Sequence, residues 1–235
     1  MSRMLYVAGP SGMAKTKVKE KLEKLAAPLG IRFERVVVAT SRDMRPSESQ
    51  GNPWYFKSAA EIDANHRKNL DRYLKVEIRK GEPQGLDAET ELKKKLETAG
   101  VLWCELHVTW LQEIEKWLKV YIPDTAITKV FFAPFAESEV LERMAREGTT
   151  WEKVIETEVL RRLVARRAAN LDNTAIEKLQ KRAQDAAQEY AARGQYDCVI
   201  VNHQGEESAE WGAATEFPTG EAARVLQQFL QIYKA

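Results

Sequence analysis

The chain has 235 residues, of which 44% are hydrophobic and 30% charged, so it is long enough to bury one sizeable α/β core. Its 36 Lys and Arg residues almost cancel its 35 Asp and Glu residues, and the resulting net charge of +1 argues against general binding to nucleic acids or membrane surfaces. No apolar run approaches the roughly 20 residues of a membrane span, and two cysteines are too few for a secreted disulfide framework, so we expect a soluble cytoplasmic protein, either a monomer or a homodimer.

Strand-like and helix-like segments alternate along the first half of the chain. The short apolar run 4–8 ends in Gly-Pro and predicts a buried strand, and the apolar spacing in 15–25 predicts a helix. Residues 33–39 predict a second strand and 41–53 a loop. Ser58 is expected to begin a helix, because Glu61 completes a capping box three residues later. A strand at 73–78, a charged helix at 87–98 and a strand at 101–106 follow.

The second half continues the alternation. A helix is predicted at 109–118, a strand at 129–133, a helix at 137–146, helical structure throughout 149–193, a strand at 197–202 and a closing helix at 221–234. Cys104 and Cys198 lie in apolar runs and are predicted to be buried thiols. Strands separated by helices indicate an α/β fold, with a mainly parallel sheet covered by helices on both faces.

The most informative segment joins the first strand to the first helix, and its sequence is Gly9-Pro10-Ser11-Gly12-Met13-Ala14-Lys15-Thr16. In this context a phosphate-binding loop (P-loop) surrounds a triphosphate with backbone N–H groups, a helix N-terminus and a lysine. Lys15 would contact the β- and γ-phosphates, and the Thr16 hydroxyl would hold Mg²⁺. Ala14 replaces the glycine of the pattern G-x-x-x-x-G-K-[ST], which predicts weaker binding. The alternative is an ordinary glycine-rich turn with a surface lysine.

Three further motifs follow in order. They are Ser41-Arg42-Asp43-Met44-Arg45-Pro46 with Gly51 and Tyr55-Phe56, then Leu141-Glu142-Arg143 followed by Glu147-Gly148-Thr149, and finally Tyr196-Asp197-Cys198-Val199-Ile200-Val201-Asn202. With the opening Gly9-Pro10-Ser11-Gly12, they resemble the GPSG, TTR-x-x-R-P…G…Y-x-F, lid and (Y/H)D-x-VIVN motifs of the guanylate kinase family. The resemblance extends over nearly the whole chain.

This resemblance implies a molecule of three parts that uses ATP and Mg²⁺. Residues 1–40, 100–148 and 195–235 would form the P-loop core, 41–99 the acceptor-binding region and 149–194 a helical lid. The loop and Asn202 would bind ATP, and Ser41, Arg42 and Arg45 would bind an acceptor monophosphate, since guanidinium groups suit phosphate. The alternative for Arg42 and Arg45 is a pair of solvated loop arginines. Glu105 would orient hydrated Mg²⁺ or the acceptor, unless it is a solvent-facing strand end.

Several positions depart from the family pattern. Trp54 stands where a phosphate-binding tyrosine is expected, with Tyr55 beside it, and Glu77 is a loose candidate for the base-reading glutamate. Gln84 replaces a second tyrosine, so the acceptor can be a nucleoside monophosphate or a sugar phosphate. In the lid, Glu147 replaces an arginine. Lid cations would come from Arg143, Arg162 and Arg166, the last two being four residues apart on one helix face, although a solvated face is the alternative.

Two hypotheses therefore remain. The first is an ATP-dependent phosphotransferase of the guanylate kinase type. The second is a nucleotide- or partner-binding protein that keeps the fold without the chemistry, as the changes at Ala14, Trp54, Gln84 and Glu147 suggest. The retained Lys15 favours the first.

Overall fold

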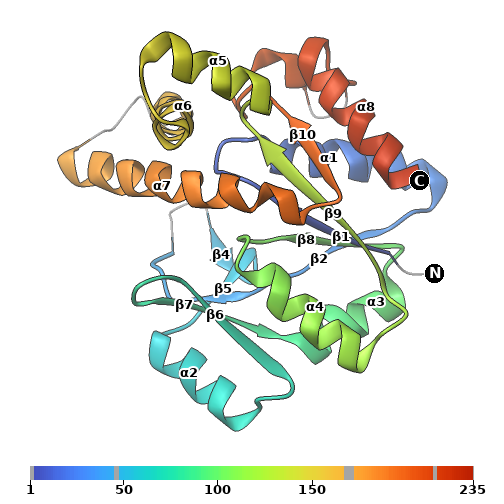
Figure 1. Ribbon diagram of the computed structural model, residues 1–235. Coiled ribbons are helices and arrows are strands. Elements are labelled where there is room, and N and C mark those ends of the chain that lie inside the picture. The colour runs from blue at the N-terminus through green and yellow to red at the C-terminus, as the bar shows by residue number, and fades with distance from the viewer. Residues whose placement is uncertain (1–2, 45–47, 167–171, 214–215, 235) are drawn as a thin grey trace. The chain divides into compact units, whose positions relative to one another are not determined.

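The computed structural model describes residues 3–44, 48–166, 172–213 and 216–234 (Figure 1). The chain divides into two compact units: unit 1 comprises 1–6 and 32–128, and unit 2 comprises 7–31 and 129–235. A five-stranded core sheet has the order β10-β9-β1-β8-β2, and its strands are β1 (Arg3–Ala8), β2 (Phe33–Arg35), β8 (Val101–Glu105), β9 (Ala126–Ala133) and β10 (Cys198–Val201). The pairs β10–β9 and β2–β8 are parallel. The predicted α/β class is confirmed, while the predicted three-part division stays a prediction.

Unit 1 contains a second sheet that the sequence patterns did not predict. Its order is β4-β5-β3-β7-β6, and its strands are β3 (Ala39–Thr40), β4 (Ser49–Gln50), β5 (Pro53–Phe56), β6 (Tyr73–Arg79) and β7 (Glu82–Asp87). The predicted strand 33–39 is wrong as one element, because its two ends belong to different sheets. The predicted loop 41–53 contains β4 and the first residue of β5. The predicted helix 87–98 is a π-helical turn (Glu89–Lys94) that continues into α3 (Lys95–Thr98).

The helices of unit 1 follow the sequence signals. Helix α2 (Ala59–Lys68) begins at Ser58, whose hydroxyl accepts from the Glu61 N–H while the Glu61 carboxylate accepts from the Ser58 N–H, so the capping box is confirmed. Ile62 of this helix is buried against Ala39 and Tyr73 of the second sheet. Helix α4 (Trp110–Tyr121) corresponds to the helix predicted at 109–118 and buries an apolar face that consists of Trp110, Leu111, Ile114, Trp117 and Leu118. Both helices are therefore held by apolar packing.

Unit 2 contains α1 (Lys15–Ala26), α5 (Glu137–Glu147), α6 (Trp151–Ala165), α7 (Asn173–Ala191) and α8 (Gly220–Lys234), with 3-10 turns at 27–29, 192–195 and 209–211. The predicted helical stretch 149–193 is thus two helices, and they pack against each other. Helix α8 packs beside α1 and β10. The apolar runs 4–8 and 130–133 are buried, as expected for strands inside a sheet covered by helices.

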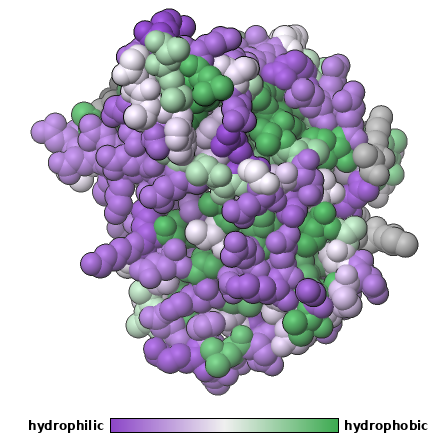
Figure 2. Space-filling model, viewed as in Figure 1, coloured by the Kyte–Doolittle hydropathy of each residue, from purple (hydrophilic) through white to green (hydrophobic). Residues whose placement is uncertain are grey.

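Cys104 is buried as predicted, whereas Cys198 is only half-buried. Hydrophilic side chains cover most of the face drawn in Figure 2, and hydrophobic ones form scattered groups. Within the part of the chain that the structure describes, no helix combines the length and apolar character needed to cross a membrane.

Candidate active site

The loop from Gly9 to Ala14 connects β1 to α1, and its backbone conformation explains its residue types. A Cβ at Gly9 would lie 2.2 Å from the Phe132 carbonyl oxygen, so only glycine allows this close approach. Ala14 adopts the left-handed conformation (φ 57°, ψ 26°) and is the only non-glycine residue among those described with a positive φ. Ala14 thus adopts a conformation that favours glycine, the residue that the loop pattern has at this position, at a cost of about 1–2 kcal/mol.

Lys15 folds back into this loop. Its Nζ donates to the carbonyl oxygens of Gly9 (2.6 Å) and Pro10 (2.8 Å), which leaves one of three ammonium hydrogens for a ligand. Helix α1 begins at Lys15 and no side chain caps its N-terminus, so the N–H groups of its first turn can meet an anion. Thr16 is exposed in that turn. A lysine, a helix N-terminus and a glycine-lined loop together fit a polyphosphate, and the predicted contact of the Thr16 hydroxyl with Mg²⁺ stays a prediction.

Of the arginines in the helices after residue 149, one that was not among the predicted lid cations contacts this loop. Arg182 of α7 donates from Nη2 to the Ser11 hydroxyl at 2.7 Å. Arg166, which was selected, forms an ion pair with Glu206 at 2.7 Å, and half of its side chain is exposed. Arg143 stacks on Phe135, with its guanidinium carbon 4.0 Å from the ring centroid. The predicted roles of Arg143 and Arg166 stay predictions, and the structure adds Arg182 to the loop.

Arg162 is enclosed by protein groups. Its side chain is 3% exposed, and its three nitrogens donate to Glu158 (2.7 Å), the Met13 sulfur (3.3 Å) and the carbonyls of Asn202 (2.9 Å) and His203 (3.1 Å). In this conformation it holds the loop against the end of β10 and is not free to meet a transferred phosphoryl group. The predicted role of Arg162 as a lid cation stays a prediction, and the two arginines differ in that Arg162 is buried and Arg166 is half exposed.

Asn202 makes a similar connection. It is fully buried, donates from Nδ2 to the Met13 carbonyl (3.0 Å) and accepts the Gln204 N–H on Oδ1 (3.0 Å). The predicted contact between Asn202 and ATP therefore stays a prediction, while its link between the loop and the segment after β10 is observed.

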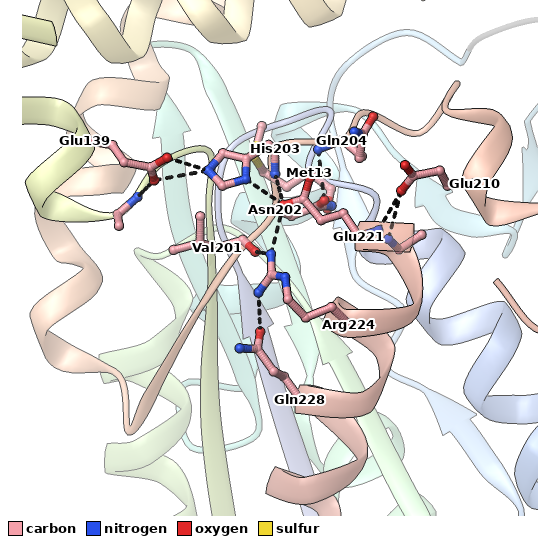
Figure 3. Close-up of polar contacts among 12 residues, drawn as sticks. Met13, Glu139, Val201, Asn202, His203, Gln204, Glu210, Glu221, Arg224 and Gln228 are labelled. Atoms are coloured by element: carbon pink, nitrogen blue, oxygen red, sulfur yellow. Dashed lines mark hydrogen bonds and ion pairs between the residues drawn. The ribbon is translucent and has the colours of Figure 1, made fainter. Parts of the chain in front are cut away.

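A histidine network follows Asn202 (Figure 3). His203 Nδ1 lies 2.6 Å from Glu221 Oε1, and its Nε2 lies 3.0 Å from Glu139 Oε2. A carboxylate therefore faces each of the two ring nitrogens of His203. Arg224 adds bonds to Glu221 (2.8 Å) and to the Val201 carbonyl (2.9 Å). The scattered histidines of the sequence gave no sign of this network, which joins α5, α8 and the end of β10.

In unit 1, Arg42 is held between aromatic rings and a carboxylate. Both of its Nη atoms donate to Glu48, at 2.7 and 2.6 Å. Its guanidinium carbon lies 5.6 Å from the centroid of Trp54 and 5.3 Å from that of Phe56. The guanidinium group of Arg42 is therefore oriented for bidentate binding of an anion, and the Glu48 carboxylate is the anion bound there in this structure. Arg45, its predicted partner, lies outside the described residues.

Comparisons with known proteins bear on this arrangement. No family model matches the chain. Curated guanylate kinases do match: the enzyme from Thermobifida fusca is 26% identical over 200 residues, which cover 85% of this chain and 83% of that protein, and that from Corynebacterium jeikeium is 24% identical over 201 residues, covering 85% and 88%. The crystal structure of guanylate kinase from Anaplasma phagocytophilum aligns with a TM-score of 0.54 at 16% identity, covering 99% of this chain and 85% of that one. The chain is therefore similar in sequence, at low identity, and in fold to guanylate kinases.

In this guanylate kinase-like protein, the alternation of side chains along β5 separates two predicted substrate contacts. Trp54 lies beside Arg42, whereas Tyr55, the next residue, projects from the opposite face of the strand. Ser41 precedes the arginine, and its buried hydroxyl lacks a hydrogen-bond partner among the described residues. Arg42 and Trp54 are thus candidates for one acceptor site, and the predicted substrate contacts of Ser41 and Tyr55 stay predictions.

Three other residues discussed for the acceptor site contact neighbouring residues of unit 1. Glu77 is exposed and accepts the Gly81 N–H at 2.7 Å, so it closes the β6–β7 hairpin. The Gln84 side chain accepts from Trp110 Nε1 at 2.9 Å. Glu105 lies 3.9 Å from Arg35 at the end of β8. The predicted contacts of Glu77 with an acceptor and of Glu105 with an acceptor or Mg²⁺ stay predictions, whereas Gln84 was noted only as a departure from the family pattern.

Proposed function

We propose that this guanylate kinase-like chain transfers the γ-phosphoryl group of ATP to a nucleoside monophosphate or a similar small phosphorylated acceptor. One observation carries the proposal: Lys15 lies at the centre of the loop, with one ammonium hydrogen left for a phosphate. Distant sequence similarity to guanylate kinases over 85% of the chain supports the same reaction class.

The chemistry needs no covalent enzyme intermediate. A phosphate oxygen of the acceptor forms a bond to the γ-phosphorus while the bond to the leaving oxygen of ADP breaks. Lys15 and the first turn of α1 would stabilise the charge on the phosphates, and Thr16 would hold Mg²⁺, which would supply further neutralisation when bound with ATP. Arg42 would exchange Glu48 for the acceptor phosphate, because both present a pair of oxygens to the guanidinium fork.

A coupled ADP-release assay tests the proposal, with ATP, Mg²⁺ and a panel of ribo- and deoxyribonucleoside monophosphates and sugar phosphates. Acceptor-dependent turnover is expected, and Lys15→Met should reduce it by orders of magnitude. Lys17→Met is the matched control, because Lys17 lies one residue further into α1 than Thr16 and pairs only loosely with Glu20 (3.7 Å). Equal turnover in the two variants would refute the role of Lys15.

A non-catalytic nucleotide- or partner-binding protein is the second candidate, and internal contacts at the acceptor positions favour it. The Gln84 side chain already accepts a hydrogen bond from Trp110, and the Arg42 guanidinium group already donates to Glu48. Trp54 has no hydroxyl group that could bind a phosphate. Silence of a folded protein across the whole panel, with no binding of ATP at millimolar concentration, would support this candidate. Measurable phosphoryl transfer would exclude it.

A further inference from the structure

Unit 1 contains a cavity of about 450 Å³ that none of the roles described above uses. Helix α2 and the residues after it form one wall, one face of the second sheet forms another, and the turn at 89–94 closes the end. The lining residues are Val37, Ala39, Tyr55, Lys57, Asn65, Asn69, Arg72, Tyr73, Gly85, Asp87, Thr90 and Glu91. The volume lies within the range of about 300–1,000 Å³ that is typical of small-molecule sites.

The strand register places this cavity and the Arg42 clamp on opposite faces of the second sheet. Ala39 pairs with Tyr55 on one side and with Gly85 on the other, and all three line the cavity. The next residues, Thr40, Phe56 and Gln84, pair in the same way and do not line it. Because successive side chains of a strand point to opposite faces, the cavity is separate from the face on which Arg42 stacks on Phe56.

One cation of the cavity lining makes no direct ion pair with a described residue, although it adds its charge to the hydrogen bonds with Ser58 that lower the pKa of Glu61. Of the two cations that line the cavity, Arg72 is paired with Asp87 (2.8 Å). Lys57 is half-buried and makes no ion pair with any residue of the described ranges. The Glu91 carboxylate is bound to Lys95 at 2.6 Å and to the Val37 N–H at 2.7 Å. An anionic group is therefore the complement that the lining lacks.

The remaining lining suits a flat, polar group. Tyr55 is 38% exposed, and its pKa is raised by burial and then by the Glu91 carboxylate, so its ring is neutral and accessible for stacking. Tyr73 lies flat against β7, where a Cβ on Gly85 would meet its hydroxyl at 2.4 Å. Asn65 and Asn69, at the end of α2, line the cavity, and Asn69 Nδ2 already donates to the Asn65 carbonyl at 3.3 Å. A side-chain amide both donates and accepts, as the edge of a nucleobase does, so each retains hydrogen-bonding capacity for a base.

We propose that this cavity binds a mononucleotide at a site separate from the Arg42 clamp. The phosphate binds Lys57, the base stacks on Tyr55, and the Asn65 and Asn69 amides contact the edge of the base. The site goes beyond the proposed phosphotransfer, and its occupancy does not depend on that activity.

Calorimetric titration of the full chain tests the proposal, with AMP, GMP, CMP and UMP as separate probes at millimolar concentration. The starting protein carries Arg42→Gln, which weakens the clamp while an amide still bonds Glu48. At least one probe should bind saturably. Adding Lys57→Met should weaken that binding about ten-fold or more, because a hydrogen bond to a charged group is lost.

Lys68→Met is the matched control, since Lys68 is exposed on α2, lies outside the cavity lining and should leave the affinity unchanged. Lys57→Gln repeats the test in case the Met variant unfolds at a lower temperature. The proposal is overturned if no probe binds saturably. It is equally overturned if binding is indifferent to Lys57 and disappears with Lys15→Met, which would place the nucleotide at the loop.

Discussion

The strongest structural prediction compares two neighbouring arginines that bond the same carboxylate. Arg161 donates to Glu158 at 3.0 and 2.7 Å, but its side chain is 64% exposed. Arg162 donates to Glu158 at 2.7 Å, and its side chain is 3% exposed. Arg162→Met keeps the apolar stem and leaves the carbonyls of Asn202 and His203 without their donor. Removing one partner of a buried ion pair costs about 3–5 kcal/mol, whereas an exposed pair contributes below about 1 kcal/mol.

Scanning calorimetry measures this difference. In a chain of this size about 1 kcal/mol shifts the unfolding midpoint by roughly 2–4 °C, so Arg162→Met should lower it by about 6 °C or more and Arg161→Met by less than about 4 °C. Burial acts to raise the pKa of Glu158, but bonds from Arg161 and Arg162 lower it overall. The Arg162→Met protein should therefore also lose stability at a higher pH than the parent as acid is added. Equal midpoints for the two variants would refute the enclosed position of Arg162.

Two other predictions concern the loop and the histidine network. Ala14→Gly should leave the unfolding midpoint nearly unchanged, whereas Ala186→Gly in α7 should lower it. Both alanines are fully buried, and each change removes a methyl group whose burial contributes about 0.8 kcal/mol. Only the change at Ala14 also relieves a left-handed conformation that costs about 1–2 kcal/mol. If calorimetry showed the same decrease in unfolding midpoint for both variants, the strain at Ala14 would be contradicted. Burial opposes ionisation of Glu139, but the Ala136 N–H and His203 lower its pKa overall, so its stabilising effect is present above its unfolded pKa of about 4.3 and is lost as the pH falls through the folded value. Glu139→Gln should therefore make the stability of the protein depend less steeply on pH below about pH 5, as measured by unfolding followed through tryptophan fluorescence. An unchanged dependence on pH would count against the network.

Local patterns were sufficient for the loop and its flanking elements. The apolar run 4–8, the glycines that follow it and the apolar spacing in 15–25 each specify structure over a few residues. The capping box at Ser58 is equally local, and it fixed the start of α2 correctly. These features need no knowledge of the rest of the chain.

The second sheet could not be found in this way. Strands β3 and β4 have two residues each, too few to show an alternation of apolar and polar side chains. Strand β7 contains Pro83 and Gly85, both of which are depleted in strands and typical of loops. The separation of Trp54 from Tyr55 onto opposite faces depends on the register of β5, which the sequence does not display.

Contacts between distant segments were also out of reach. Arg182 meets Ser11 across 171 positions of sequence, and His203 meets Glu139 across 64. Arg162 and Arg166 look equivalent on a helix drawn from the sequence alone, although one is buried by the loop and the other is exposed. Only the packing of the helices distinguishes them.

The alternation along β5 also bears on how this protein can evolve. Substitutions at Trp54 or Phe56 alter the face that carries Arg42, while substitutions at Tyr55 alter the cavity, so selection can change either surface without disturbing the other. A one-residue insertion or deletion inside the strand has the opposite property, because it would exchange the two sets of side chains at once. We therefore expect lineages of this chain to tolerate point substitutions in β5 far better than changes in its length.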